Sequence, residues 1–344
     1  MSDLKIHNPV VPRGSRILVT GANGFIASHV VDQLLGAGWD VRGTVRDKSR
    51  TEWLNALFDE KYGPGRFETV QVPDLSLPDA FEDAVKGVSG IVHVASILTF
   101  DSNPNAVIPP LLAGTLGLLR SAAKEPGVKR FVLTSSSWSA SLPSIGKKIT
   151  LAEDTYNEAA VEAAYAPPPY EPQRGAAVYA ASKVKVEQAI TQWVEENSPR
   201  FEVNFVLPSA NFGPVLHKDH PGSMPWQWPV AVYHGKVAEV SVPSQNWIDV
   251  QDAARLHVAA LLLPEVRKHE RIFGYAGIYT INGLLAILRK LYPERQFPDD
   301  IVDEAVDLTE TPPAARAEEL LRLLGRDGWT KLEDTVAGNL EGQV

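Results

Sequence analysis

Short apolar segments rich in valine and isoleucine recur along the chain, and amphipathic segments separate them. The segments that predict strands are 16–20, 41–46, 67–72, 90–95, 129–135 and 201–207. Between them, apolar residues recur every three or four positions, which is the spacing of a helix that buries one face. The segments that predict helices are 25–35, 80–86, 107–124 and 180–197. This alternation predicts an α/β fold, a doubly wound parallel sheet of Rossmann type with helices on both faces.

The pattern loosens in two proline-containing stretches, 137–175 and 208–247, each of which follows a predicted strand. In open α/β sheets, ligands bind beyond the carboxyl ends of the strands. We therefore expect a smaller, mostly C-terminal substrate lobe beside the sheet. The expected boundaries are 1–207 plus roughly 244–265 for the sheet domain, and 208–243 with 266–344 for the lobe.

Composition and charge narrow the function. The 344 residues carry a formal net charge of −9, which argues against nucleic acid and anionic membranes as partners, because both attract basic surfaces. The chain has no cysteine, so disulfides, thiolate catalysis and cysteine-ligated metals are excluded. We expect no metal site. No apolar run approaches the ~18 residues that span a bilayer, and we expect a cytoplasmic protein, either a monomer or a homodimer.

A glycine-containing turn joins the first predicted strand to the first predicted helix. It reads Thr20-Gly21-Ala22-Asn23-Gly24-Phe25-Ile26-Ala27. Gly21 permits the tight turn, Gly24 allows the backbone to approach a pyrophosphate, and Ala27 is small enough for the helix to pack on the strand. The free N–H groups of the helix N-terminus then favour phosphate. The placement of the turn favours a dinucleotide site over a simple strand–helix turn.

The second predicted strand indicates which dinucleotide binds. NAD sites usually have an acidic residue at the end of this strand, whereas this chain has Arg46 there, with Lys48 nearby. Arginine can bind the 2′-phosphate of NADP with two hydrogen bonds. The alternative for Arg46 is a solvated surface side chain, and the adjacent Asp47 is an acid. The strand favours NADP as the cofactor, which makes the sheet domain an NADP-binding domain.

A tyrosine and a lysine lie one helical turn apart at Tyr179 and Lys183, where a helix is expected to open. Reduction of a carbonyl group needs a proton for its oxygen, and free tyrosine is a weak acid at neutral pH. A nearby lysine cation is expected to lower the pKa of Tyr179. The fifth predicted strand ends in Thr134, Ser135 and Ser136, and a serine hydroxyl there could bind the substrate oxygen. The alternatives are a surface pair and a serine-rich turn.

These three motifs together resemble the extended short-chain dehydrogenase/reductases over nearly the whole chain. Residues 41–47 and Gly114-Thr115-Leu116 look like the dihydroflavonol reductase branch. Within that branch, the chain is most similar to the NADPH-dependent aldehyde and carbonyl reductases of fungi and yeasts. The resemblance implies reduction of an aldehyde or ketone to the alcohol by hydride transfer from NADPH, with Tyr179 as the proton donor.

The resemblance also implies roles for single residues. It assigns catalysis to Ser136, Tyr179 and Lys183, with Ser135 one position away as the other serine. The residues expected to contact NADP are Gly21, Asn23, Gly24, Phe25, Ile26, Arg46, Lys48, Asp74, Leu75, Val94, Ala95, Ser96, Thr134, Tyr179, Lys183, Pro208 and Asn211. Residues 247–252 resemble a motif that supports the lobe, although Asp252 is better interpreted as the N-cap of the following helix.

The substrate is expected to be a small carbonyl compound. Phe100, Trp138 and Trp226 are candidates for an apolar substrate wall, and a plain lobe core explains any one of them equally well. The aromatic motif of cinnamoyl-CoA reductases is missing around Tyr179, which argues against a CoA thioester. A nucleotide-sugar epimerase or dehydratase is the alternative, but residues 201–254 contain no arginine to bind a diphosphate. A non-catalytic NADP-sensing regulator is less favoured, because such proteins lose the Tyr–Lys pair.

Overall fold

A computed structural model describes residues 4–220 and 222–342. Its central sheet has seven parallel strands in the order β10-β7-β5-β4-β1-β2-β3. The strands are β1 (Arg16–Thr20), β2 (Asp40–Val45), β3 (Phe67–Gln71), β4 (Gly90–His93), β5 (Arg130–Thr134), β7 (Glu202–Pro208) and β10 (Arg271–Gly274). The expected doubly wound sheet is confirmed. Its strand order reverses between β1 and β4, which places a ligand crevice at the carboxyl ends of those strands.

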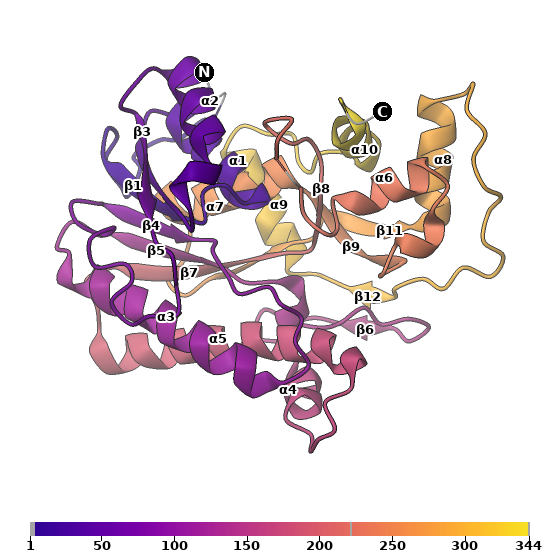
Figure 1. Ribbon diagram of the computed structural model, residues 1–344, viewed down its shortest axis with the longest axis horizontal. Coiled ribbons are helices and arrows are strands. Elements are labelled where there is room, and N and C mark those ends of the chain that lie inside the picture. The colour runs from indigo at the N-terminus through magenta and orange to yellow at the C-terminus, as the bar shows by residue number, and fades with distance from the viewer. Residues whose placement is uncertain (1–3, 221, 343–344) are drawn as a thin grey trace.

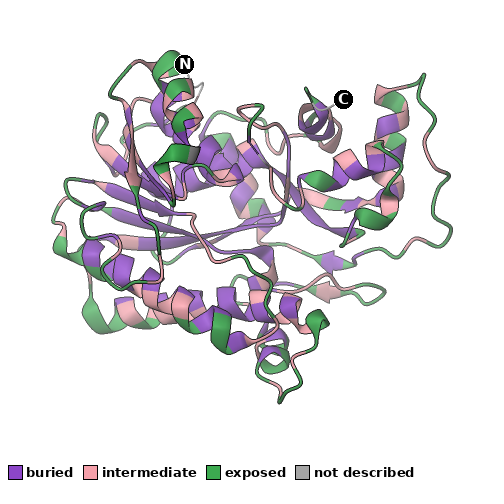
Figure 2. Ribbon diagram, viewed as in Figure 1, coloured by how far each residue is buried: buried purple, intermediate pink, exposed green. Residues whose placement is uncertain are grey.

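Helices cover both faces of the sheet (Figure 1). One face carries α1 (Phe25–Gly36), α2 (Glu52–Tyr62), α7 (Val250–Leu262) and α9 (Ala314–Leu323). The other face carries α3 (Pro104–Lys124), α4 (Glu158–Ala164) and α5 (Gly175–Asn197). Figure 2 shows the sheet strands buried along most of their length, with exposed residues on the outer sides of the helices. The sheet is thus the middle of three layers.

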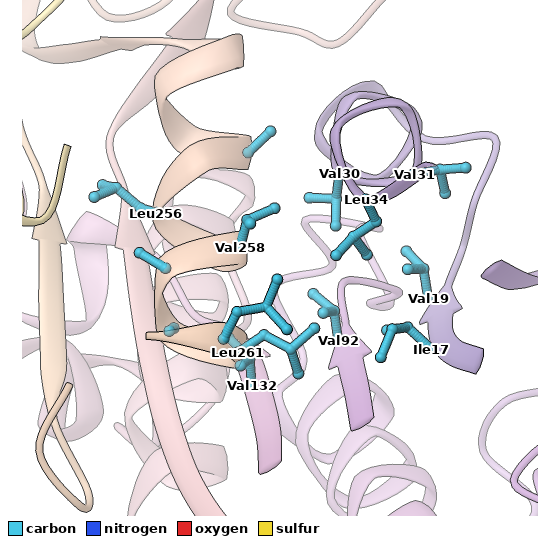
Figure 3. Close-up of a cluster of buried hydrophobic side chains, with 14 of the residues drawn as sticks. Ile17, Val19, Val30, Val31, Leu34, Val92, Val132, Leu256, Val258 and Leu261 are labelled. Carbon is cyan, nitrogen blue, oxygen red and sulfur yellow. The ribbon is translucent and has the colours of Figure 1, made fainter. Parts of the chain in front are cut away.

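The main core lies between β1, β4 and β5 and the helices α1 and α7. Figure 3 shows Ile17 and Val92 from the strands pointing toward Leu34 of α1 and Leu261 of α7. Fully burying one such side chain stabilises a fold by about 1.5–3 kcal/mol. α7 is buried on nearly every side, and its buried alanines permit a close approach to α1. This packing holds β1 and β4 in place, and the ligand crevice lies at the carboxyl ends of these strands.

A smaller lobe begins where β7 ends, because β8 (Ala210–Phe212) follows β7 after a single residue. β8 joins β9 (Ser244–Asp249) and β11 (Gly277–Thr280) in a second sheet of order β11-β9-β8. The helices α6 (Gln227–Tyr233), α8 (Ile281–Leu291) and α10 (Leu332–Leu340) belong to this lobe. Two further strands, β6 (Ile149–Thr150) and β12 (Thr309–Glu310), pair with each other. The short 3-10 turns are η1 (Lys48–Arg50), η2 (Ser137–Ser139), η3 (Pro172–Arg174) and η4 (Val237–Glu239).

The boundary between sheet domain and lobe differs from the one expected. The range 244–265 was expected in the sheet domain, yet β9 pairs with β8 and β11 of the lobe, and only α7 packs on the main sheet. The range 266–344 was expected in the lobe, yet β10 is an edge strand of the main sheet and α9 packs against it. β10 has only four residues, so its apolar pattern is too short to stand out.

Three local expectations also differ from the structure. Residues 80–86 form consecutive turns and no helix, because Gly87 ends a segment that is too short to propagate one. The helix α2 was not expected, because it buries only Leu54 and Phe58 along a largely polar surface. The N-cap of α7 is Asp249, whose carboxylate accepts a hydrogen bond from the backbone N–H of Gln251 at 2.7 Å. The interpretation of Asp252 as the N-cap is therefore wrong.

The helix α3 is long and apolar enough, by length and composition, to cross a membrane. The expectation that no segment reaches this threshold is wrong, because it considered only uninterrupted apolar runs. More than half of the most apolar part of α3 is buried inside the fold. The helix packs against α5 and the main sheet, as a core helix of an α/β domain does.

Candidate active site

The turn between β1 and α1 presents backbone N–H groups at the carboxyl edge of the sheet. Gly21 has a φ of +66°, in the left-handed region that favours glycine. A Cβ on Gly21 would lie 3.2 Å from Ala95, so the close approach of the two loops also favours glycine. Among the described residues, no side chain caps α1, whose N-cap is Gly24. The first turn of α1 therefore offers N–H groups that suit a phosphate.

Two buried threonines hold this turn in place. The hydroxyl of Thr44 in β2 accepts a hydrogen bond from the N–H of Gly21 at 3.1 Å. The hydroxyl of Thr20 in β1 accepts hydrogen bonds from the N–H groups of Val94 and Ala95, each at 3.0 Å. The loop after β1 and the loop after β4 are thus tied together, and they form adjacent walls of one crevice.

The exit of β2 places a guanidinium at the rim of this crevice. Arg46 is exposed, and among the side chains that the structure describes none forms an ion pair with it. The carboxylate of Asp47 accepts hydrogen bonds from the N–H and hydroxyl of Ser49, at 3.0 and 2.8 Å. Asp47 therefore caps the following turn. Hydrogen bonds from Ser76 and the charge of Arg46 hold the pKa of Asp74 below its usual value, so Asp74 and Arg46 flank the same part of the crevice.

The loop that carries Asp74 and Leu75 lies directly against α3. A Cβ on Gly114 of α3 would overlap the carbonyl oxygen of Leu75. Only glycine permits this approach. The close contact between α3 and the loop at Leu75 therefore gives a physical reason for the glycine in the Gly114-Thr115-Leu116 segment. The backbone of α3 thereby supports the wall of the crevice.

The end of β5 and the face of α5 meet through three consecutive residues. The carbonyl oxygen of Thr134 accepts a hydrogen bond from Nζ of Lys183 at 3.4 Å. The hydroxyl of Ser135 donates to a carboxylate oxygen of Glu187, and Ser136 forms a side-chain hydrogen bond with Tyr179. Of the two candidate serines, Ser136 is therefore the one beside Tyr179, and Ser135 is engaged by the helix. Tyr179, Lys183 and Ser136 form one cluster.

Burial dominates the electrostatics of this cluster. It raises the pKa of Tyr179 above its ordinary value, although the hydrogen bond with Ser136 acts in the opposite direction. Burial lowers the pKa of Lys183 to about 8, and the charge of Glu187 opposes that change. The expectation that Lys183 lowers the pKa of Tyr179 is therefore wrong for this structure. A raised pKa keeps the phenol protonated at neutral pH, which suits a proton donor.

Two aromatic rings enclose Tyr179. Phe100 stacks on it with ring centroids 5.0 Å apart, and Trp138 meets it edge-on at 5.7 Å. The indole N–H of Trp138 donates to the side-chain oxygen of Gln245 at 3.0 Å, which fixes the orientation of the ring. These contacts surround the phenol ring with two apolar rings.

A single cavity of about 1410 Å³ joins the glycine turn to the Tyr179 cluster. This volume exceeds the 300–1,000 Å³ of a typical small-molecule pocket. The expected site residues that line it are Gly21, Asn23, Gly24, Phe25, Ile26, Arg46, Asp74, Leu75, Val94, Ala95, Ser96, Phe100, Thr134, Ser136, Trp138, Tyr179, Lys183, Pro208 and Asn211. The structure thus brings these residues together around one cavity from seven separate stretches of the chain.

Two expected residues do not line the cavity. Lys48 lies in η1 and is exposed, because the chain turns away from the crevice after Asp47. Trp226 is buried against Phe25 and Val250, and its carbonyl oxygen accepts a hydrogen bond from Asn339 at 3.0 Å. Its assignment to the substrate wall is corrected: its ring packs where the lobe meets α1 and α7.

Replacing Trp226 with alanine is expected to lower the free energy of unfolding by about 3–5 kcal/mol, because it removes a buried indole and leaves a cavity. Denaturant unfolding of the variant measures this loss. Trp138→Ala provides the matched control, since it should change the KM of the carbonyl substrate with a smaller loss of stability. A Trp226→Ala protein of parental stability and altered substrate preference would restore the substrate-wall assignment.

The cavity also contains residues that the sequence did not single out. Gln245, Trp53 and His220 line it, from β9, α2 and the loop before α6. Gln245 lies in a strand with no distinguishing motif, and Trp53 is close to the site only because α2 packs beside β3. Glu187 lies behind the cluster; its one signal in the sequence is its spacing of four residues from Lys183.

Comparison with known proteins gives consistent matches over most of the chain. The family model described as the NAD dependent epimerase/dehydratase family matches residues 17–275. Aldehyde reductase 2 of Sporidiobolus salmonicolor is 41% identical over 96% of this chain and 97% of its own length. A ketoreductase of Aspergillus novofumigatus is 40% identical over 95% of this chain and 96% of its own length.

A solved structure shares the fold as a whole. The yeast methylglyoxal/isovaleraldehyde reductase Gre2, complexed with NADPH, superposes with a TM-score of 0.77 at 26% identity. The match covers 96% of this chain and 100% of Gre2. The sheet domain and the lobe described above therefore recur together in an NADPH-bound reductase.

Proposed function

The chain belongs to the NAD dependent epimerase/dehydratase family, among the extended short-chain dehydrogenase/reductases, and on this premise we propose that it reduces an aldehyde or ketone to the alcohol with NADPH. The observation that carries the proposal is the Ser136–Tyr179–Lys183 cluster at one end of a cavity whose other end is the glycine turn. The reductase names of its relatives support the same reaction.

Each residue of the cluster has its own role in the proposed reaction. NADPH, when bound, supplies the hydride. The hydroxyl of Tyr179 donates the proton to the substrate oxygen, and Ser136 donates a hydrogen bond that stabilises charge on that oxygen. Lys183 sits below the Tyr179 ring, 5.8 Å from its centroid, and donates to Ser96 at 3.2 Å. Its ammonium is placed to hold ribose hydroxyls of the cofactor and to keep the local potential positive.

The residues present fit a dinucleotide phosphate. The uncapped turn of α1 suits the pyrophosphate, and the free guanidinium of Arg46 suits a 2′-phosphate. Asp47, the acid that could favour the ribose hydroxyls of NAD, has its carboxylate engaged by Ser49. We therefore propose that Arg46 selects NADP, and that the residues of the cavity named above contact it.

Arg46→Ala is expected to erode the preference for NADPH. Each hydrogen bond between charged groups contributes about 1.5–3 kcal/mol, and ~1.4 kcal/mol is a factor of ten. The parent should favour NADPH over NADH by roughly tenfold or more, and the variant should lose that margin by weaker use of NADPH alone. The measurement is kcat/KM for both cofactors. Equal use of both cofactors by the parent would show that Arg46 is only a surface residue.

The cavity walls near Tyr179 favour bulky apolar carbonyl compounds. Phe100 and Trp138 contact Tyr179 at this end, Met224 also lines the cavity, and Lys183 is the charged lining residue that lies against the Tyr179 ring. A nucleotide sugar needs cations for its diphosphate, and residues 201–254 contain no arginine. We propose an aromatic or branched aldehyde or ketone as the substrate class.

Loss of NADPH absorbance with a panel of carbonyl compounds tests the proposed function. Turnover of aromatic and branched carbonyls, with little or none of UDP-sugars, is the expected result. Efficient conversion of a UDP-sugar without net NADPH consumption would favour the epimerase alternative. We further propose a cytoplasmic enzyme, because the chain lacks cysteine and α3 is packed inside the fold.

A further inference from the structure

A fully buried carboxylate lies directly behind the catalytic cluster. The side chain of Glu187 in α5 is 0% exposed. Isolated burial of a carboxylate costs several kcal/mol, so such groups persist where hydrogen bonds and an opposite charge accompany them. Here one carboxylate oxygen accepts from the hydroxyl of Ser135, and the other accepts from Nε of Arg271 at 2.7 Å. Neither Ser135 nor Glu187 has a role in the reaction as proposed so far.

Arg271 is itself held in one orientation. Its guanidinium donates to the carbonyl oxygens of Glu153 and Thr155, at 2.9 and 2.7 Å, and to the hydroxyl of Ser139 at 3.3 Å. It also lies over the ring of Tyr156, 4.1 Å from the centroid. β10 therefore presents a fixed cation to Glu187, and this cation determines where the carboxylate stands on α5.

The contact between Ser135 and Glu187 lies between two contacts that serve catalysis. Along β5, the carbonyl of Thr134 meets Lys183, and Ser136 meets Tyr179. Along α5, Glu187 follows Lys183 by one turn, on the same face of the helix. A shift of α5 against β5 would break all three contacts together. The Ser135–Glu187 contact is thus the middle one of three adjacent contacts between α5 and β5.

We propose that Glu187, oriented by Arg271, is a positioning residue for the reduction: it sets the register of α5 on β5 through Ser135, and its charge keeps Lys183 in the ammonium form. This inference rests on the proposed function of Tyr179 and Lys183. The carboxylate acts through other side chains and lies outside the cavity lining.

The charge effect follows from the groups that surround Lys183. Burial lowers the pKa of Lys183 to about 8, and the charge of Glu187 raises it. The other titratable groups facing it are Tyr179 on α5, whose pKa is raised by burial, and His93 on β4, whose pKa burial lowers to about 3. His257 on α7, which contacts Thr134, has its pKa lowered by burial to about 4. Both histidines are thus neutral near pH 8, and Glu187 is the nearby anion.

The test compares Glu187→Gln with two matched variants. Loss of the anion lowers the pKa of Lys183, so the basic limb of the pH profile of kcat/KM for NADPH should move to lower pH by roughly one unit. Ser135→Ala keeps the charge of Glu187 but removes its hydrogen bond to β5, so α5 is held less firmly on β5. We therefore expect kcat to fall about tenfold and the basic limb of the pH profile to stay where it is. Glu270→Gln removes a carboxylate that is 1% exposed and paired with Arg316; it should lower stability and leave the limb in place.

A second readout separates this proposal from the proposed function. The NMR titration of ¹³C-labelled lysine, with the Lys183 signal assigned by its loss in Lys183→Ala, reports the charge state without carbonyl turnover. If Glu187→Gln does not fold, the double variant Glu187→Gln, Arg271→Met removes both charges and should show a smaller shift to lower pH, because loss of the Arg271 cation partly offsets loss of the Glu187 anion. An unchanged Lys183 titration in either variant, or a Glu187→Gln that loses only stability as Glu270→Gln does, would overturn the proposal. A parent that titrates as expected but reduces no carbonyl compound would refute the proposed function instead.

Discussion

Tyr179→Phe is expected to lower kcat by about 10²–10⁴, the range for loss of a general acid. The phenyl ring can keep its contacts with Phe100 and Trp138, so the fold and NADPH binding should persist. Only the proton and the hydrogen bond with Ser136 are removed. The measurement is single-turnover reduction by the variant, with NADPH affinity determined separately by fluorescence.

The control for this variant is Tyr275→Phe. Tyr275 is also buried, and its hydroxyl donates to the carbonyl of Ser137 at 3.2 Å. It should lose stability and keep most of its turnover, because it places no proton in the cavity. A Tyr179→Phe protein that reduces carbonyls at the parental rate would show that another group supplies the proton.

Ser136→Ala is expected to lower kcat by about 10²–10³, as the loss of a single hydrogen-bond donor to a developing oxyanion does. The side chain contacts Tyr179, so the change also removes a partner of the phenol. The KM for NADPH should change little, because the glycine turn and Arg46 are untouched. Steady-state kinetics with a reactive aldehyde measures the effect.

Ser135→Ala is the matched control for Ser136→Ala. Ser135 donates to Glu187, so Ser135→Ala should cost about tenfold in kcat and less than Ser136→Ala. A larger loss for Ser135→Ala than for Ser136→Ala would reverse the assignment of the two serines.

The sequence predicts six of the seven strands of the central sheet, because most of these six are buried apolar runs with a clear boundary. It predicts the domain boundary poorly. β9 and α7 are contiguous in the chain, yet β9 pairs with β8 in the lobe and α7 packs against α1. The position of this domain boundary depends on which strands and helices pack together in the folded protein, and the local sequence pattern does not indicate it. β10 is similarly hidden, since four residues carry too little periodicity to define a strand.

The site residues also fall into two groups, those with a recognisable sequence pattern and those without one. The glycine turn, Arg46 and the Tyr179–Lys183 pair carry short-range patterns with a mechanism attached, and the structure places them around one cavity. Trp226 shows where such reasoning fails, because an aromatic residue in a proline-rich loop suits a substrate wall and a buried interface equally. Glu187 and Gln245 contact Arg271 and Trp138, both distant in sequence, and these contacts become visible only in the folded structure.

The most direct test of the central claim is the fate of a deuteride on the cofactor. NADPH deuterated at the transferable position of the nicotinamide is incubated with the enzyme and an aromatic aldehyde, and the products are analysed by mass spectrometry and NMR. Carbonyl reduction predicts one deuterium at the carbinol carbon for each cofactor oxidised, and Tyr179→Phe should suppress that transfer by about 10²–10⁴. Deuterium retained on the cofactor without net oxidation, together with conversion of a nucleotide sugar, would contradict the account.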